Sequence, residues 1–250
     1  MKRNKIRIID VTESTNSLLK AEAEAGSATA GTVIRTHFQT AGKGRLDRQW
    51  DCPPGKGLIF SLLFKPDLPQ THLQLVGLMA SLAVLEGILK TDDGFSLRGR
   101  LTLKWPNDIL GDGSKICGIL CESGMDKSGG TFVIVGIGLN VLQTATEFPS
   151  GLRRPATSLY LLTGKEFDMQ ILLDSILNCF NSLLEQIKEH GTAWVTSEWM
   201  TKAAIFGKLI RIDIGSEEVS GTCMGLSECG GIILKLPSGK TRTVYSGDVA

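Results

Sequence analysis

The sequence has few of the residues that build metal centres or disulfide frameworks. It contains six cysteines and three histidines in 250 residues, and no two cysteines form a Cys-x-x-Cys pair. Structural zinc sites need closely spaced cysteine and histidine ligands, and small disulfide-stapled domains need a much higher cysteine density. These shortages predict a reduced, cytoplasmic protein with no metal held by its own side chains.

Long apolar runs and an excess of charge of one sign are also missing. We expect no stretch that approaches the roughly 20 apolar residues of a membrane-spanning helix, and no signal peptide at the basic N-terminus. Lysine and arginine number 27 against 26 aspartates and glutamates, which gives a net charge of +1. Because general nucleic-acid binding depends on a basic surface, the sequence predicts neither a membrane protein nor a DNA-binding protein.

What the sequence does contain is enough apolar material for a large core. Hydrophobic residues make up 42% and charged residues 21% of the chain, as in ordinary globular proteins. Up to residue 206, helix-like and strand-like segments alternate, whereas from Gly207 onward short strands and turns recur about every ten residues. We therefore predict a large domain over 1–206 and a small all-β domain over 207–250.

Hairpins, not β-α-β repeats, dominate the first domain. Strands are expected at 5–11, 32–38, 58–64, 101–105, 115–124 and 130–142, and helices at 14–26, 72–90, 168–189 and 192–204. The two strands at 115–124 and 130–142 are joined by a short polar turn, which favours an antiparallel pair. The predicted fold class is α+β with a mixed or mainly antiparallel sheet.

The 115–142 hairpin combines a fully aliphatic face with a face that carries glycines. A turn centred near residues 126–128 would place Gly118 opposite Gly136, so that two neighbouring strands lack side chains at one place. Glycine inside a strand often marks the close approach of a ligand or of another part of the protein. The pattern leaves both explanations open.

Residues 40–50, TAGKGRLDRQW, form a glycine-rich loop with three cations. Gly42 and Gly44 would let backbone N–H groups converge on an anion, with Lys43, Arg45 and Arg48 as the opposite charge. The loop matches neither the phosphate loop of nucleoside triphosphatases nor the dinucleotide-binding fingerprint. Taken alone, the loop favours a solvated turn over an anion site.

Five short motifs occur in a specific order, and together they resemble the biotin–protein ligases, that is, the biotin–[acetyl-CoA-carboxylase] ligases. They are STN at 14–16, QTAGKGRLDRQW at 39–50, KWPNDI at 104–109, KICGILCE at 115–122 and GIGLNV at 136–141. The tail, with YSGDV at 245–249, is similar to the SH3-like C-terminal domain of that family. The resemblance implies a biotin/lipoate ligase type catalytic domain followed by this small β domain.

The resemblance also implies a two-step reaction. Biotin and ATP, with Mg²⁺, would give biotinyl-5′-AMP, and the biotinyl group would pass to a lysine of the biotin carboxyl carrier protein of acetyl-CoA carboxylase or of a related carboxylase. A homodimer is left open. Because the chain starts almost at the first strand of the ligase region, we do not expect the N-terminal DNA-binding domain that some members carry.

Site residues follow from the matched motifs. The resemblance assigns catalysis to Lys115, Arg45 and Asp108. It assigns biotin contacts to Ser14, Thr15, Asn16, Gln39, Gly42, Lys43, Gly44, Arg45, Lys115, Gly118 and Gly136, and nucleotide contacts to Lys43, Arg45, Arg48 and Asn140. Two positions depart from the family, which commonly has arginine at position 43 and often glycine where this chain has Asp47.

Two other functions remain compatible with the sequence. One is a lipoate or octanoate–protein ligase of the same superfamily, against which the GKGRLDRQW and KWPND motifs argue. The other is a biotin- or nucleotide-binding regulator without catalysis, against which the intact Lys115, Arg45 and Asp108 argue. Loading with biotin and turnover would separate the three.

Overall fold

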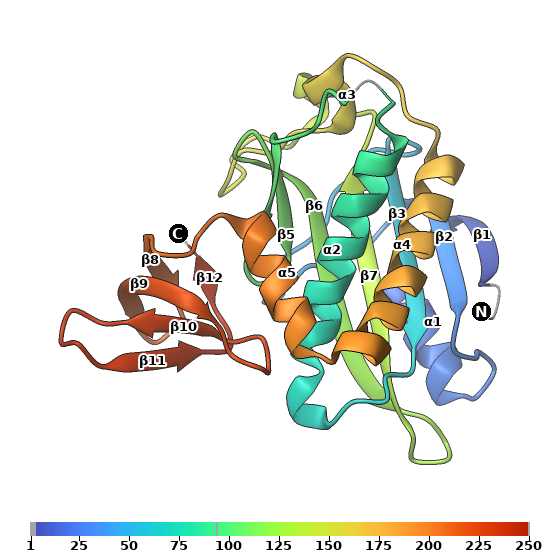
Figure 1. The fold of residues 1–250 in the computed structure, drawn as a ribbon. Helices are drawn as coiled ribbons and strands as arrows, with labels where there is room; N and C mark the ends of the chain where they lie inside the picture. Colours follow the sequence, from blue (N-terminus) through green and yellow to red (C-terminus); the bar gives the residue numbers. More distant parts are fainter. Residues whose placement is uncertain (1–3, 94, 250) are drawn as a thin grey trace.

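The computed structural model describes residues 4–93 and 95–249, and a seven-stranded sheet forms the centre of the larger domain (Figure 1). Its strand order is β1-β2-β3-β7-β6-β5-β4, with β1 parallel to β2 and the other neighbours antiparallel. The predicted mixed sheet is confirmed. The strands are β1 Lys5–Thr12, β2 Thr32–Gln39, β3 Gly57–Phe64, β4 Leu101–Lys104, β5 Asp108–Gly111, β6 Ser114–Met125 and β7 Thr131–Asn140.

Helices cover both faces of this sheet. Figure 1 shows α2, α4 and α5 together on one face and α1 on the other. The helices are α1 Thr15–Glu24, α2 Gln74–Thr91, α3 Leu159–Thr163, α4 Met169–His190 and α5 Ala193–Ala203, with 3₁₀ turns at Gln70–His72 and Ala145–Glu147. The helix α3 and the strand β5 were not predicted, because segments of five and four residues are too short to show a periodic pattern.

Side-chain caps fix where the long helices begin. The Ser14 hydroxyl accepts a hydrogen bond from the backbone N–H of Ser17 and so caps the start of α1. Asp168 does the same for α4, accepting from the N–H groups of Gln170 and Ile171 at 2.7 and 2.9 Å. Because this cap fixes where α1 begins, Thr15 and Asn16 lie in its first turn, at the end of the helix that contacts the sheet.

The helix α2 is apolar around most of its circumference and lies in the core, as its sequence predicts. The segment Gln70–Thr91 reaches a mean hydropathy of 1.6 over 18 residues, so by length and composition it is long and apolar enough to cross a membrane. The expectation that no stretch would reach this limit was therefore wrong. In the fold, 67% of that window is buried against the sheet, α4 and α5, which is the environment that its composition requires.

The last residues form a second, five-stranded antiparallel sheet in the order β11-β10-β9-β8-β12. The predicted boundary after residue 206 lies in the segment between α5 and the first of these strands. The strands are β8 Leu209–Asp213, β9 Glu218–Leu226, β10 Ile232–Lys235, β11 Thr241–Val244 and β12 Asp248–Val249. Trp105 of the larger domain donates its indole N–H to the Gly230 carbonyl at 3.0 Å, which ties the two sheets together.

The register of the β6–β7 hairpin differs from the prediction. Gly118 pairs with Gly138, and Gly136 pairs with Leu120, so the predicted pairing of Gly118 with Gly136 was wrong by two residues. The pairing ends at Met125 and Thr131, so the turn is centred one residue later than expected, where the Asp126 carboxylate accepts hydrogen bonds from the N–H groups of Ser128 and Gly130. Since the error is an even number of residues, the glycines keep their predicted face.

The packing of α2 on α4 predicts that Gly87 tolerates no side chain. A Cβ atom there would lie 2.7 Å from Ile176 Cγ1 and 2.8 Å from Ile176 Cα, so Gly87→Ala should lower the free energy of unfolding by about 1–3 kcal/mol. Gly77, in the same helix, is the matched control: the nearest atom to its added Cβ is Cys121 Sγ at 3.7 Å. Gly77→Ala should be neutral or stabilising by up to about 1 kcal/mol. Urea unfolding of both variants measures the difference, and equal effects would contradict it.

Candidate active site

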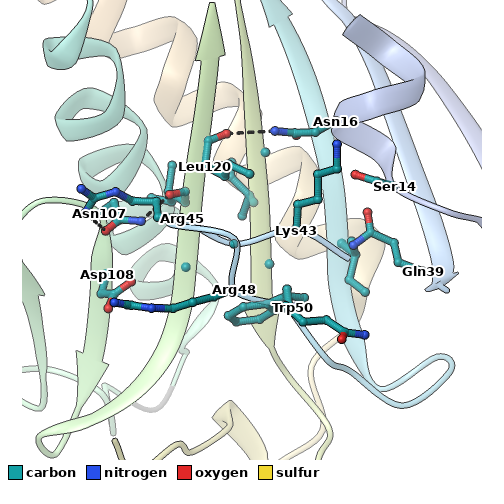
Figure 2. Close-up of a pocket in the computed structure, with 18 of the residues that line it drawn as sticks. Ser14, Asn16, Gln39, Lys43, Arg45, Arg48, Trp50, Asn107, Asp108 and Leu120 are labelled. Atoms are coloured by element: carbon teal, nitrogen blue, oxygen red, sulfur yellow. Dashed lines mark hydrogen bonds between the residues drawn. The ribbon is translucent and has the colours of Figure 1, made fainter. Parts of the chain in front are cut away.

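A cleft of about 750 Å³, including its open mouth, lies on the α1 side of the sheet and collects the five motifs (Figure 2). The predicted site residues that line it are Ser14, Thr15, Asn16, Gln39, Lys43, Gly44, Arg45, Arg48, Asp108, Lys115, Gly118 and Gly136. Residues from α1, β2, β5, β6 and β7 thus meet in one place, although Thr15 and Gly138 stand far apart in the chain.

One end of the cleft is neutral and polar. Gln39 Oε1 accepts from the Thr15 backbone N–H at 2.8 Å and lies 3.1 Å from the Thr15 hydroxyl. Asn16 Nδ2 donates to the Leu120 carbonyl at 3.2 Å (Figure 2). Ser14, Thr15 and Asn16 are all almost fully buried, so this end is a rigid set of hydrogen-bonding groups.

The glycines of β6 and β7 make room for protein side chains as well as for the cleft. A Cβ on Gly136 would lie 2.1 Å from Asn16 Oδ1, and one on Gly138 would lie 2.4 Å from Trp50 Cε2. A Cβ on Gly118 would come within 3.1 Å of Trp50 Cζ3. The sequence left open whether these glycines make room for a ligand or for another part of the protein. These contacts show that they make room for Asn16 and Trp50.

The loop over the cleft is a small hairpin closed on itself. Trp50 N donates to the Gly42 carbonyl at 2.9 Å, and Gly44 N donates to the Arg48 carbonyl at 2.7 Å. Leu46 and Asp47, at its tip, have φ values of 54° and 56°. This left-handed backbone costs a non-glycine residue roughly 1–2 kcal/mol, a cost that glycine at position 47 would remove.

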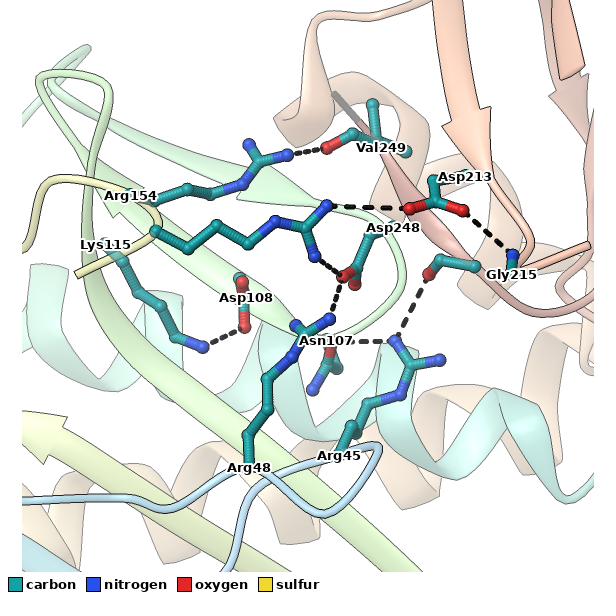
Figure 3. Close-up of polar contacts among 12 residues, drawn as sticks. Arg45, Arg48, Asn107, Asp108, Lys115, Arg154, Asp213, Gly215, Asp248 and Val249 are labelled. Atoms are coloured by element: carbon teal, nitrogen blue, oxygen red, sulfur yellow. Dashed lines mark hydrogen bonds and ion pairs between the residues drawn. The ribbon is translucent and has the colours of Figure 1, made fainter. Parts of the chain in front are cut away.

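Two cations of the loop, Arg45 and Arg48, turn toward the C-terminal domain (Figure 3). Arg48 forms an ion pair with Asp248, and Arg45 donates to the Asn107 side-chain oxygen at 3.2 Å and to the Gly247 carbonyl at 3.4 Å. Burial works against ionisation of Asp248, but its bond to Arg48 and the nearby arginines outweigh burial and hold its pKa below the usual value. The C-terminal strand β12 is thus part of the cleft wall.

A second pair of arginines holds the same strand from the other side. Arg153 lies 2.9 Å from the Asp248 carboxylate and 3.7 Å from that of Asp213, and Arg154 donates to the Val249 carbonyl. Both arginines belong to the loop between the second 3₁₀ turn and α3, and neither is among the predicted site residues. Asp248, like the arginines, could not be assigned to the site from its motif alone.

Lys115 occupies the centre of the charged end. Its ammonium lies 2.7 Å from the Asp108 carboxylate and 5.6 Å from the centre of the Trp50 ring. Lys104, next to this pair on β4, is half-buried, and burial followed by the nearby Arg154 charge lowers its pKa to about 8. A surplus of positive charge in a partly dry cleft calls for an anionic ligand.

Two predicted site residues do not line the cleft. Gly42 lies under the loop, where a Cβ would be 2.3 Å from the Trp50 carbonyl oxygen, so its contribution is to loop shape. Asn140 is buried below the cleft floor, where it donates to the Thr157 carbonyl at 3.0 Å and accepts from Gln143 at 2.9 Å. A direct nucleotide contact by Asn140 stays a prediction.

Within residues 4–93 and 95–249, no group of three histidine, cysteine or carboxylate side chains could hold a metal ion. Asp108 is paired with Lys115, and Asp248 with Arg48 and Arg153. A magnesium ion that enters this cleft would therefore rest mainly on the phosphates of a bound nucleotide.

Comparison with known sequences is decisive at this point. Residues 8–140 match the Biotin/lipoate A/B protein ligase family, and residues 205–250 match the Biotin protein ligase C terminal domain. The chain belongs to the biotin/lipoate A/B protein ligase family. The predicted resemblance and the α+β fold class with its small β domain are confirmed.

Two relatives and one solved structure show how far the family likeness extends. The chain is 32% identical over 245 residues to the bifunctional ligase/repressor BirA of Bacillus subtilis, covering 96% of this chain and 72% of that protein. It is 31% identical to a biotin–[acetyl-CoA-carboxylase] ligase of Paracoccus denitrificans, covering 92% and 93%. The structure of a biotin protein ligase from Aquifex aeolicus in complex with biotin and ATP superposes with a TM-score of 0.81 at 30% identity, covering 98% and 97%.

The lowered pKa of Lys104 predicts an unusual dependence of stability on pH. Below about pH 8 both folded and unfolded chains carry the proton, and the folded chain bears the cost of a half-buried charge. Between about 8 and 10.4 the unfolded chain binds one proton more, so the free energy of unfolding rises with pH. Lys104→Met should therefore be more stable than wild type at neutral pH, with the difference shrinking as pH rises through this range.

Denaturant unfolding of wild type and Lys104→Met across that pH range measures the effect. Other groups titrate in both proteins and cancel in the comparison. A difference that grows with rising pH would contradict the assignment.

Proposed function

We propose that this protein is an ATP-dependent biotin–protein ligase that makes biotinyl-5′-AMP and transfers the biotinyl group to a carrier lysine. The observation that carries the proposal is a single cleft with two unlike ends. Its neutral end offers the buried hydroxyl and amide groups around Thr15 and Gln39, and its other end gathers Arg45, Arg48 and Lys115. Biotin is itself a molecule with an uncharged, N–H-bearing ring at one end and a carboxylate at the other.

In the first step a carboxylate oxygen of biotin attacks the α-phosphorus of ATP, and pyrophosphate leaves with the electrons of the broken P–O bond. Two anions must approach each other, so the reaction needs positive charge where they meet. Lys115 and Arg45 line the cleft at that end, and Arg48 stands beside them. Fixed charges in a partly buried site stabilise the developing charge without rearranging water.

Magnesium supplies further charge neutralisation on the phosphates when ATP is bound. The loop of residues 42–50 covers the cleft, with Trp50 seated against Gly118 and Gly138. This cover keeps water from the mixed anhydride, which would otherwise hydrolyse.

In the second step the amine of a lysine attacks the carbonyl carbon of the adenylate, AMP leaves, and an amide forms. The attacking amine must lose a proton. Asp108 is the carboxylate beside Lys115, with a side chain only 16% exposed. We assign it the role of orienting the incoming amine and accepting its proton.

The carrier is proposed from the relatives. The similar proteins of Paracoccus denitrificans and Mycobacterium tuberculosis are named as ligases that act on acetyl-CoA carboxylase. We propose that the partner here is the biotin carboxyl carrier protein of that enzyme or of a related carboxylase. A lipoate ligase remains the second candidate within the family, but the clustered N–H acceptors at the neutral end favour a ligand that donates N–H groups.

The direct test is to incubate the full chain with ATP, Mg²⁺, biotin and a biotin carrier domain. We expect a mass gain of one biotinyl group on one carrier lysine, and none with lipoate in place of biotin. Lys115→Met should slow ATP–pyrophosphate exchange by about 10²-fold or more, as loss of one charge-stabilising group does elsewhere. Lipoyl transfer, or no transfer and no exchange, would overturn the proposal.

The Asp108 assignment makes a separate prediction. Asp108→Asn should leave ATP–pyrophosphate exchange, which reports the first step, within a few-fold of wild type. It should slow transfer from preformed biotinyl-5′-AMP to the carrier by about 10²–10⁴-fold, the usual loss of a general base. Transfer at the wild-type rate would rule out this role.

A further inference from the structure

A chain of hydrogen bonds lies directly beneath the neutral end of the cleft. Ser61, on β3, is completely buried, and its hydroxyl oxygen lies 2.6 Å from Asn16 Oδ1 and 2.7 Å from Thr15 Oγ1. On the far side of Asn16, its Nδ2 is 2.7 Å from Glu122 Oε2. Neither Ser61 nor Glu122 is among the predicted site residues.

Counting protons fixes the direction of this chain. The Asn16 amide donates its two hydrogens to Glu122 and to the Leu120 carbonyl, so its Oδ1 must face Ser61. An amide oxygen can only accept, and a hydroxyl has one proton, so Ser61 donates to Asn16. The single proton of Thr15 then serves acceptors inside the protein, Ser61 Oγ at 2.7 Å and Gln39 Oε1 at 3.1 Å.

The consequence reaches the ligand surface. With its proton held by a protein oxygen, the Thr15 hydroxyl has only lone pairs left for the cleft that it lines. Its neighbour Gln39 Oε1 is also an acceptor and is held by the Thr15 backbone N–H. This end of the cleft is therefore set to receive N–H donors, as a cyclic urea presents, and to reject groups that only accept.

Hydrogen bonding, not space, holds the amide in this orientation, because the amide oxygen and nitrogen are nearly the same size. A Cβ on Gly136 would lie 2.1 Å from Asn16 Oδ1, so the amide packs directly against β7. Turning the amide over would aim its hydrogens at Ser61 and its oxygen at the Glu122 carboxylate, placing two acceptors against each other.

We propose that Ser61 and Glu122 are positioning residues that fix the orientation of the Asn16 amide and, through it, the acceptor character of Thr15 toward the substrate. The inference rests on the proposed function, since it explains why the cleft takes a ligand with N–H donors. Neither residue touches the cleft ligand in this scheme; both act through Asn16 and Thr15.

Biotin binding to the full chain without ATP, measured by calorimetry, tests the proposal. Ser61→Ala removes the relay and should raise the dissociation constant about tenfold, the usual size of a lost buried hydrogen bond. The matched control is Ser81→Ala: Ser81 is equally buried, and its hydroxyl accepts from Trp199 Nε1 at 2.9 Å in the helix layer. It should lower the melting temperature without changing biotin affinity.

A polarity swap tests the direction of the chain. Asn16→Asp puts a carboxylate against Glu122 and should weaken biotin binding by at least about tenfold. Glu122→Gln alone should have little effect, because the glutamine oxygen still accepts from Asn16. In the double variant Asn16→Asp/Glu122→Gln, the glutamine amide donates to the new carboxylate, and most of the lost affinity should return.

The outcomes separate two failures. If wild type binds biotin and Ser61→Ala binds equally well, or if the double variant is as weak as Asn16→Asp, the positioning roles are wrong. If wild type binds no biotin at all, the proposed function itself fails, and this inference falls with it.

Discussion

The ion pair between Arg48 and Asp248 joins the loop of residues 42–50 to the last strand of the C-terminal domain. Arg45, Arg48 and Arg153 surround this one carboxylate. They come from two loops, and without Asp248 the positive charges of these loops would repel each other. With Asp248 between them, the loop of residues 42–50 and the loop before α3 both rest on the last strand of the C-terminal domain. The small β domain thus completes the charged wall of the cleft instead of standing apart from it.

A second constraint acts at the neutral end, and it is steric. Gly136 and Gly138 leave no side chain on the cleft face of β7, and Asn16 and Trp50 fill the space. The helix α1 and the covering loop can therefore both lie close against the same strand. The polar groups that would bind the ring of a ligand and the cations that would hold its anionic end therefore lie in one cleft, because α1 and the covering loop both pack against β7.

Much of the fold could be predicted. The helix α2, the β6–β7 hairpin and the change of pattern near residue 206 follow from periodicity, and Ser14 follows from capping chemistry. The hairpin register could not be predicted, because the centre of the turn depends on which backbone N–H groups the Asp126 side chain binds. Ser61 was missed for a different reason: a single serine in an apolar strand gives no signal until its partners on α1 are known.

The sequence by itself determined which chemical groups this protein has and the order in which its helices and strands carry them. These properties depend on near neighbours in the chain, where spacing, caps and motifs operate. Only the tertiary structure decided that Asp248 would neutralise Arg48 and that Ser61 would direct the Asn16 amide. The first pair is 200 positions apart and the second 45, and such contacts depend on strand register and domain packing, which local patterns do not encode.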